Sequence, residues 1–143
     1  MKSKILIIDD EVEICDMLSR HFRYIGYEVD TTTNPIEALD KLAENNFQVA
    51  ILDIVMPKMS GIDLLRTIRK QYPMTHVVMI TGCVTLDNAL SCMRLGADTC
   101  IFKPLEDLTE LEEAVANALK SLKHWQEKFK MLQLMGDAQR EVI

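Results

Sequence analysis

Five polar residues stand where apolar, strand-like runs end, and their side chains are of types that bind metal ions or phosphoryl groups. Asp9 and Asp10 follow the run ILII, and Asp53 follows VAIL. Thr81 follows VVMI, and Lys103 follows CIF. If these strands are parallel, their carboxyl ends share one edge of a sheet, and ligands of such sheets bind in the crevice beyond that edge. We therefore expect the five side chains to form one site.

The acidic members of this group imply a bound cation. Carboxylates gathered in one crevice repel one another and raise their own pKa values unless a cation lies among them. Oxygen ligands without a neighbouring sulfur or imidazole favour Mg²⁺, which keeps several water ligands and readily bridges to phosphate oxygens. The sequence therefore predicts a magnesium site at the carboxylate cluster.

A carboxylate beside a metal ion can act as a nucleophile toward phosphorus and form an aspartyl phosphate. Asp53 is the best placed of the acids, because it ends the central strand of the expected sheet. Charge on the transferred phosphoryl oxygens needs cationic and donor partners, which the metal, Lys103 and the Thr81 hydroxyl provide. Gly82 leaves room for a phosphoryl group, and the Lys103-Pro104 bond is a candidate cis peptide that would aim the lysine inward.

Strand-like runs alternate with segments of helical period along the chain. Apolar runs rich in β-branched residues predict strands over residues 4–8, 28–32, 47–52, 76–80 and 99–102. Apolar residues at three- or four-residue spacing predict helices over residues 12–25, 35–42, 62–72, 86–95 and from about 107 onward. Right-handed crossovers then give an α/β fold, a five-stranded parallel sheet of the doubly wound, flavodoxin-like (βα)5 type with helices on both faces.

Composition places the chain among ordinary globular proteins. Its 143 residues are 48% hydrophobic and 27% charged, which suits one domain with one core. The net charge of -6 disfavours broad attraction to nucleic acid or anionic lipid, so we expect neither direct nucleic-acid binding nor membrane binding.

The cysteines and the N-terminus bear on the compartment. Cys15, Cys83, Cys92 and Cys100 lack the spacing of a zinc site and are interpreted as free thiols. Two aspartates break the first apolar run at once, so that run is neither a signal peptide nor a membrane span. We therefore expect a reducing cytoplasm.

In order and spacing, these motifs resemble the receiver domains of two-component response regulators. The motifs are IIDDE, LDIVMPKMSGIDLL, MITG and FKP, and the resemblance covers roughly residues 3–120. It implies that a sensor histidine kinase, a phosphotransfer protein or a small phosphodonor phosphorylates Asp53. It also implies that Asp10, Asp53 and the backbone carbonyl of Val55 hold Mg²⁺, with Asp9 acting through water.

Two positions depart from the family pattern. An aromatic residue usually stands three positions before the lysine and swings inward on phosphorylation, whereas this chain has Cys100 there. Phe102 cannot simply replace that ring, because it points to the opposite strand face from Lys103. The second position after Asp53 is the apolar Val55, which predicts slow loss of the phosphoryl group. Val55 also argues against a phosphohydrolase, which needs an acid at that position.

Residues 121–143 are expected to form a helical extension of the receiver domain of residues 1–120. The heptad that leads into it consists of Leu108, Val115, Leu122 and Phe129 at one position, and Leu111, Ala118, Trp125 and Leu132 at the other. Beyond Ser121 the apolar stripe needs a partner other than the sheet, and a homodimer through residues 108–134 is the simplest.

Three alternatives for the extension and its function stay open at this point. The helix, which is expected to stop near Gly136, is a linker to a further domain, or it folds back on its own domain. The alternative function is a receiver-like dimerisation module that works without phosphorylation.

Overall fold

The computed structural model describes residues 2–82 and 85–135. The thiol of Cys83 and the stop expected near Gly136 lie outside this part of the chain. The elements are β1 (Lys4–Ile8), α1 (Val12–Tyr24), β2 (Glu28–Thr32), α2 (Pro35–Glu44), β3 (Val49–Asp53), α3 (Gly61–Gln71), β4 (His76–Thr81), α4 (Leu86–Arg94), β5 (Thr99–Phe102) and α5 (Thr109–Leu134). The predicted alternation of strand and helix is confirmed.

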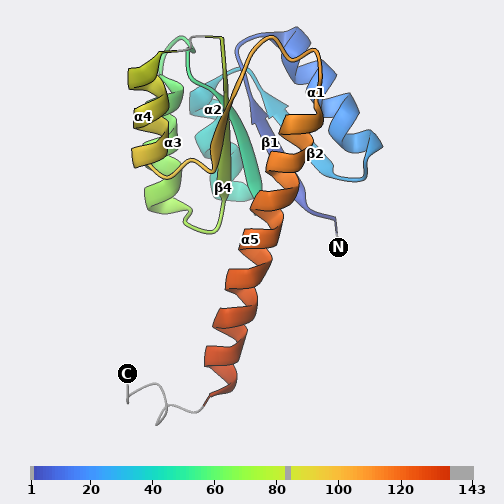
Figure 1. Cartoon of the computed structure of the whole chain (residues 1–143), viewed down its shortest axis with the longest axis vertical. Coiled ribbons are helices and arrows are strands. Elements are labelled where there is room, and N and C mark those ends of the chain that lie inside the picture. Colours follow the sequence, from blue (N-terminus) through green and yellow to red (C-terminus); the bar gives the residue numbers. More distant parts are fainter. Residues whose placement is uncertain (1, 83–84, 136–143) are drawn as a thin grey trace.

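The five strands form one parallel sheet in the order β2-β1-β3-β4-β5. Successive side chains of a strand point to opposite faces, so Leu6 and Ile8 pack under α2, α3 and α4, whereas Ile5 and Ile7 pack under α1 and α5. Figure 1 shows α3 and α4 on one side of the sheet and α1 and α5 on the other. This is the doubly wound α/β fold expected from the sequence. The strand order reverses between β1 and β3, so a ligand crevice is expected at their carboxyl ends.

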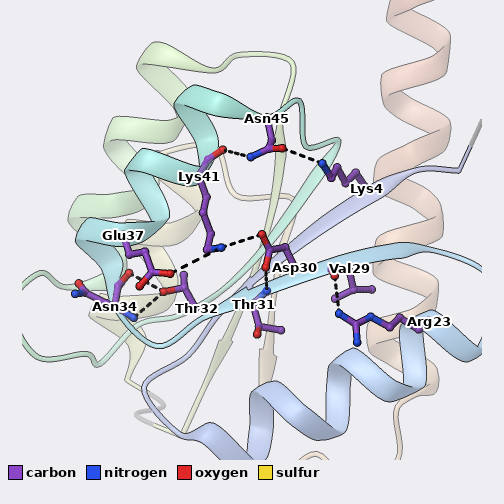
Figure 2. A network of polar contacts seen from close by, with 10 residues as sticks. All are labelled: Lys4, Arg23, Val29, Asp30, Thr31, Thr32, Asn34, Glu37, Lys41 and Asn45. Carbon is purple, nitrogen blue, oxygen red and sulfur yellow. Dashed lines mark hydrogen bonds and ion pairs between the residues drawn. The ribbon is translucent and has the colours of Figure 1, made fainter.

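Polar contacts hold the edge strand β2 in place (Figure 2). Lys41 Nζ of α2 lies 3.0 Å from Asp30 Oδ2 of β2. The Thr32 hydroxyl accepts the backbone N–H of Asn34 at 3.1 Å, and the Thr32 carbonyl accepts that of Asp9 at 3.3 Å. The end of β2 thereby supports the loop that carries the first acids.

Helix α5 runs on past the sheet as one continuous helix (Figure 1). Its buried residues are Leu111, Val115, Ala118 and Leu122, whereas all residues from Lys123 to Leu134 are exposed. As far as Leu134 the extension therefore continues α5 without a break and buries no residue beyond Leu122. Within this same part of the chain, no helix is both long and apolar enough to cross a membrane.

Candidate functional site

Three carboxylates meet beyond the carboxyl ends of β1 and β3. One ligand oxygen from each of Asp9, Asp10 and Asp53 lies within 4.8 Å of the other two. Asp9 and Asp53 are buried, and Asp10 is exposed. Asp9 also shapes the turn that leads into α1, because its Oδ1 accepts the backbone N–H of Glu11, the N-cap residue, at 2.9 Å. Asp9 therefore both supports the local backbone and supplies charge to the site.

Lys103 reaches this cluster from the end of β5. Its Nζ lies 3.0 Å from Asp9 Oδ2, 3.3 Å from Asp53 Oδ2 and 3.6 Å from Glu11 Oε1. Its backbone N–H donates to the carbonyl of Thr81 at 2.8 Å, which holds the lysine to the end of β4. The Lys103-Pro104 peptide is cis, as predicted.

A cavity of about 400 Å³ opens beside the cluster. It is lined by Asp10, Glu11, Asp53, Val55, Gly82 and Lys103. The backbone N–H of Val55 donates to the Asp53 carboxylate, whereas the Val55 side chain is 57% exposed. Thr81 is buried at the end of β4, directly before Gly82. The structure thus brings to one edge the residues that the sequence predicted for the phosphoryl and metal site.

The charges of the site are unevenly balanced. Burial raises the pKa of Asp9, and burial together with the charge of Asp9 raises the pKa of Asp53. Burial alone would lower the pKa of Lys103, but attraction to Asp9 and Asp53 outweighs it and raises that pKa. One ammonium group therefore faces several carboxylates, and a further cation would relieve their repulsion.

The donor set fits a hard divalent cation. It consists of carboxylate oxygens, and Mg²⁺ prefers oxygen ligands. Asp9 Oδ2 is buried, and among the described residues it has an ion pair with Lys103 but no well-aligned hydrogen bond. An acceptor in this state has lone pairs left for a metal ion or for a water molecule of its shell.

Three further residues shape the site and were not identified from the sequence. A Cβ atom at Gly61 would lie 1.9 Å from the carbonyl oxygen of Asp53, so only glycine fits there. Cys15 donates its thiol to the carbonyl of Asp9 at 3.3 Å, beneath the acid pair. Glu11 contacts Lys103 at 3.6 Å. In the sequence Gly61 looks like the start of a helix, Cys15 like a core position and Glu11 like a neighbour of a helix cap. No local signal therefore marks them as residues of the site.

The structure also shows what replaces the aromatic switch residue. Cys100 lies on β5 and packs against the core under α3 and α4, and Phe102 follows it with 52% of its surface exposed. The buried neighbour Ile101 packs on the opposite face with α1 and α5. In the described part of β5, the position three residues before Lys103 therefore carries a thiol that packs on the core, and not an aromatic ring.

Comparisons with known proteins agree with this geometry. The sequence matches the family "Response regulator receiver domain" over residues 5–116. It is 37% identical over 105 residues to the transcriptional regulatory protein CpxR homolog of Haemophilus influenzae, which covers 73% of this chain and 45% of that protein. It is 35% identical over 119 residues to the response regulator protein PilR of Pseudomonas aeruginosa, which covers 83% and 26%. The chain thus spans about half or less of the length of these curated relatives.

Solved structures give the same result. A response regulator receiver domain protein from Methanospirillum hungatei aligns with a TM-score of 0.83 and 31% identity over 87% of this chain and 98% of that one. The response regulator protein TrrA from Thermotoga maritima, solved in complex with Mg(2+)-BeF, aligns with a TM-score of 0.74 and 35% identity over 82% and 99%. Each solved chain is matched over nearly its whole length, so the likeness extends over the complete fold.

Proposed function

Because this chain belongs to the family of response regulator receiver domains, we propose that Asp53 is the phosphoacceptor of a two-component signalling switch. A receiver domain is a phosphoacceptor signalling module and not an enzyme that turns over an external substrate. The observation that carries the assignment is the carboxylate cluster with the Lys103 ammonium 3.3 Å from Asp53.

Among the three acids, Asp53 is best placed for the reaction. Asp9 is fully buried and is not among the residues that line the cavity. Asp10 lines the cavity, but it is exposed and lies in the loop after β1. Asp53 lines the cavity, ends the central strand and faces the open space beside Gly82, where a Cβ atom would meet nothing nearer than Lys103 at 3.9 Å.

In the proposed reaction, an Asp53 carboxylate oxygen attacks phosphorus while the bond from phosphorus to the donor breaks, which leaves an acyl phosphate on Asp53. Lys103 and the hydroxyl of Thr81 would stabilise the charge on the phosphoryl oxygens. Asp9, Asp10, Asp53 and the backbone carbonyl of Val55 would hold Mg²⁺, directly or through water. Bound Mg²⁺ would supply the positive charge that lets an anionic donor approach these carboxylates. The Mg(2+)-BeF complex of the Thermotoga relative supports this choice of metal.

The phosphodonor is proposed to be a sensor histidine kinase or a phosphotransfer protein, since receiver domains accept their phosphoryl group from proteins of these two kinds. A cytoplasmic location is part of the proposal, because a reducing compartment keeps thiols such as Cys15, Cys92 and Cys100 free.

The direct test is intact-mass analysis after incubation with acetyl phosphate and Mg²⁺. We expect one added phosphoryl group on the wild type and none on Asp53→Ala. Asp40→Ala, which removes an exposed carboxylate on α2, is the matched control and should be modified like the wild type. Modification of Asp53→Ala, or none of the wild type even with a competent histidine kinase, would overturn the assignment and favour the phosphorylation-independent module.

We also propose that residues 1–120 act as the receiver domain and that the extension from residue 121 mediates homodimerisation. Trp125 and Phe129 continue the stripe of Leu122 beyond the domain, and their rings stack with centroids 6.0 Å apart. They line a hollow of about 390 Å³ together with Pro73 and Met74 at the turn before β4. An exposed apolar stripe of this kind is typical of an interface, and a second copy of the helix offers a matching stripe.

Size-exclusion chromatography with light scattering tests the dimer. Trp125→Ala combined with Phe129→Ala should lower the measured mass to that of a monomer. Met131→Ala removes an exposed apolar side chain that lies off the stripe, so it should leave the mass unchanged. A monomeric wild type at high concentration would exclude the dimer and leave the linker helix as the interpretation of residues 121–134.

A further inference from the structure

Two thiols meet between α4 and β5, away from the carboxylate site. Cys92 of α4 is 2% exposed, and Cys100 of β5 is partly buried in the same core cluster. Both are free, they line the same cavity, and each thiol shifts the pKa of the other, so the two side chains are neighbours. The two thiols therefore lie side by side, although eight positions and a change of element separate them in the sequence.

The pair is also reachable from solvent. A cavity of about 230 Å³ is lined by both cysteines together with Ala89, Met93 and Thr99. This volume exceeds that of a water molecule several times, so a molecule of the size of hydrogen peroxide can enter it. Cys100 is the more exposed of the two thiols and would be met first.

We propose that Cys92 and Cys100 are a modification site at which hydrogen peroxide forms an intramolecular disulfide that ties α4 to β5. The Cys100 thiolate attacks one peroxide oxygen, the O–O bond breaks and one water leaves after protonation, so Cys100 becomes a sulfenic acid. The Cys92 sulfur then attacks the Cys100 sulfur, the S–O bond breaks and a second water leaves. The two thiols lose two electrons and two protons, and the peroxide is reduced to two waters.

The position of Cys92 gives this bond a structural consequence. Cys92 is the buried residue of α4, whereas α1, α2, α3 and α5 each bury three or more residues. A disulfide holds its sulfur atoms about 2.05 Å apart, which is much closer than two unbonded sulfur atoms can approach. Closing that gap draws α4 toward β5 at the one point where its side chains enter the core.

The surroundings of the thiols make the reaction slow at neutral pH. Burial raises the pKa of Cys100 to about 11, and the neighbouring Cys92 and the charge of Glu110 contribute to the rise. Burial likewise raises the pKa of Cys92. Because the thiolate is the reactive form, the rate should rise about tenfold per pH unit below that value. The site thus responds to sustained oxidation and stays reduced under ordinary cytoplasmic conditions. It does not depend on phosphorylation of Asp53.

Peptide mapping of the full-length chain tests the proposal without a phosphodonor. Trypsin leaves Cys83 and Cys92 in one peptide, residues 71–94, and Cys100 in another, residues 95–120, so the Cys83→Ser variant is used to remove the ambiguity. After treatment with hydrogen peroxide and capping of the remaining thiols, we expect a cross-linked pair of these peptides, lighter by two hydrogens than their sum. Dithiothreitol should release it, and Cys15 should remain a capped thiol.

Two further readouts separate the proposed bond from other oxidation. The cross-link should occur within one chain, so the denatured, non-reduced protein should keep the monomer mass. Amide hydrogen exchange in residues 86–94 should slow on oxidation and recover on reduction. The proposal is overturned if Cys92 and Cys100 oxidise separately to sulfinic acids, if the bond joins two chains, or if Cys100→Ser gives the same cross-linked mass.

Discussion

The ammonium group of Lys103 lies 3.0 Å from Asp9 Oδ2 and 3.3 Å from Asp53 Oδ2, so one cation is shared between two buried carboxylates. Only Asp53 of these two acids lines the cavity where a phosphodonor would enter. The lysine therefore has two functions in the metal-free protein: it offsets the repulsion between the acids, and it stands beside the proposed phosphoacceptor.

Lys103→Met should lower the free energy of unfolding at pH 7 by about 1–3 kcal/mol, because it leaves two buried carboxylates without a counter-ion. The loss should shrink toward pH 4, because Asp9 and Asp53 have raised pKa values and protonate readily in the folded state. Urea unfolding at both pH values measures it. Lys41→Met, which breaks the more exposed pair with Asp30, is the control and should cost less than about 1 kcal/mol. An equal loss at pH 4 and pH 7 would assign the effect of Lys103 to packing.

Asp53→Asn should stabilise the metal-free protein at pH 7, by an amount on the order of 1 kcal/mol. The pKa of Asp53 is raised in the folded state, so folding favours the protonated form and the ionised form costs stability above the ordinary value of 3.8. The advantage of Asn should therefore be full at neutral pH and vanish as pH falls below 3.8, where Asp53 is protonated in both states. Urea unfolding between pH 3 and pH 7 without Mg²⁺ checks this. A constant difference across that range would contradict the pKa argument.

Much of the fold follows from local signals in the sequence. Each apolar run that was predicted as a strand forms one, because five alternating strand and helix segments have few other ways to bury their apolar faces. Strand boundaries differ by one or two residues: β3 spans Val49–Asp53, although the apolar run begins at Phe47, and β4 continues to Thr81. Phe47 is buried although it lies before the strand. An apolar residue in the sequence therefore predicts burial, but it does not by itself show whether the residue belongs to the strand.

The strand-end acids could be found in advance because the topology fixes their common edge. The contacts of Gly61 with Asp53 and of Cys92 with Cys100 could not, because they depend on how a loop or helix returns to the sheet. Neither contact is indicated by a regular spacing of residues or by a local sequence motif. Such residues become recognisable only once the distance between elements is known.

Mg²⁺ should raise the melting temperature of the wild type by about 5–10 °C when its concentration is a hundred times the dissociation constant. The rise follows because the ion binds the folded carboxylate cluster and not the unfolded chain. Asp10→Ala should abolish most of the rise, and because Asp10 is exposed, this change should cost little stability in EDTA. Differential scanning fluorimetry with a Mg²⁺ titration measures both effects. An equal shift in Asp10→Ala would place the ion elsewhere.

Gly61→Ala should destabilise the protein by about 2 kcal/mol or more and impair phosphorylation together with folding. The added Cβ atom would lie 1.9 Å from the backbone oxygen of Asp53, so either the loop or the phosphoacceptor must move. Gly82→Ala is the matched control for stability, since its Cβ atom would meet only Lys103, at 3.9 Å. Urea unfolding and phosphoryl incorporation from acetyl phosphate are the measurements. If Gly61→Ala has the stability and the phosphoryl incorporation of the wild type, the loop after Asp53 can move to accept the Cβ atom without a loss of free energy of unfolding.

Loss of the phosphoryl group should be slow in the wild type and about three to ten times faster in Val55→Asn. The valine presents a branched apolar side chain at the cavity that water must cross to reach Asp53, whereas asparagine can orient a water molecule by hydrogen bonding. The backbone N–H that Val55 donates to Asp53 is retained in the variant, so the comparison isolates the side chain. Intact-mass analysis over time, after removal of acetyl phosphate, gives the rates.

Ile36→Asn is the control for this comparison, because it replaces another exposed β-branched residue, on α2 and outside the cavity. It should leave the rate of phosphoryl loss unchanged. Wild-type loss as fast as that of the quickest receiver domains would refute shielding by Val55. Equal rates in the wild type and Val55→Asn would show instead that water reaches the phosphoryl group by a path that avoids this side chain.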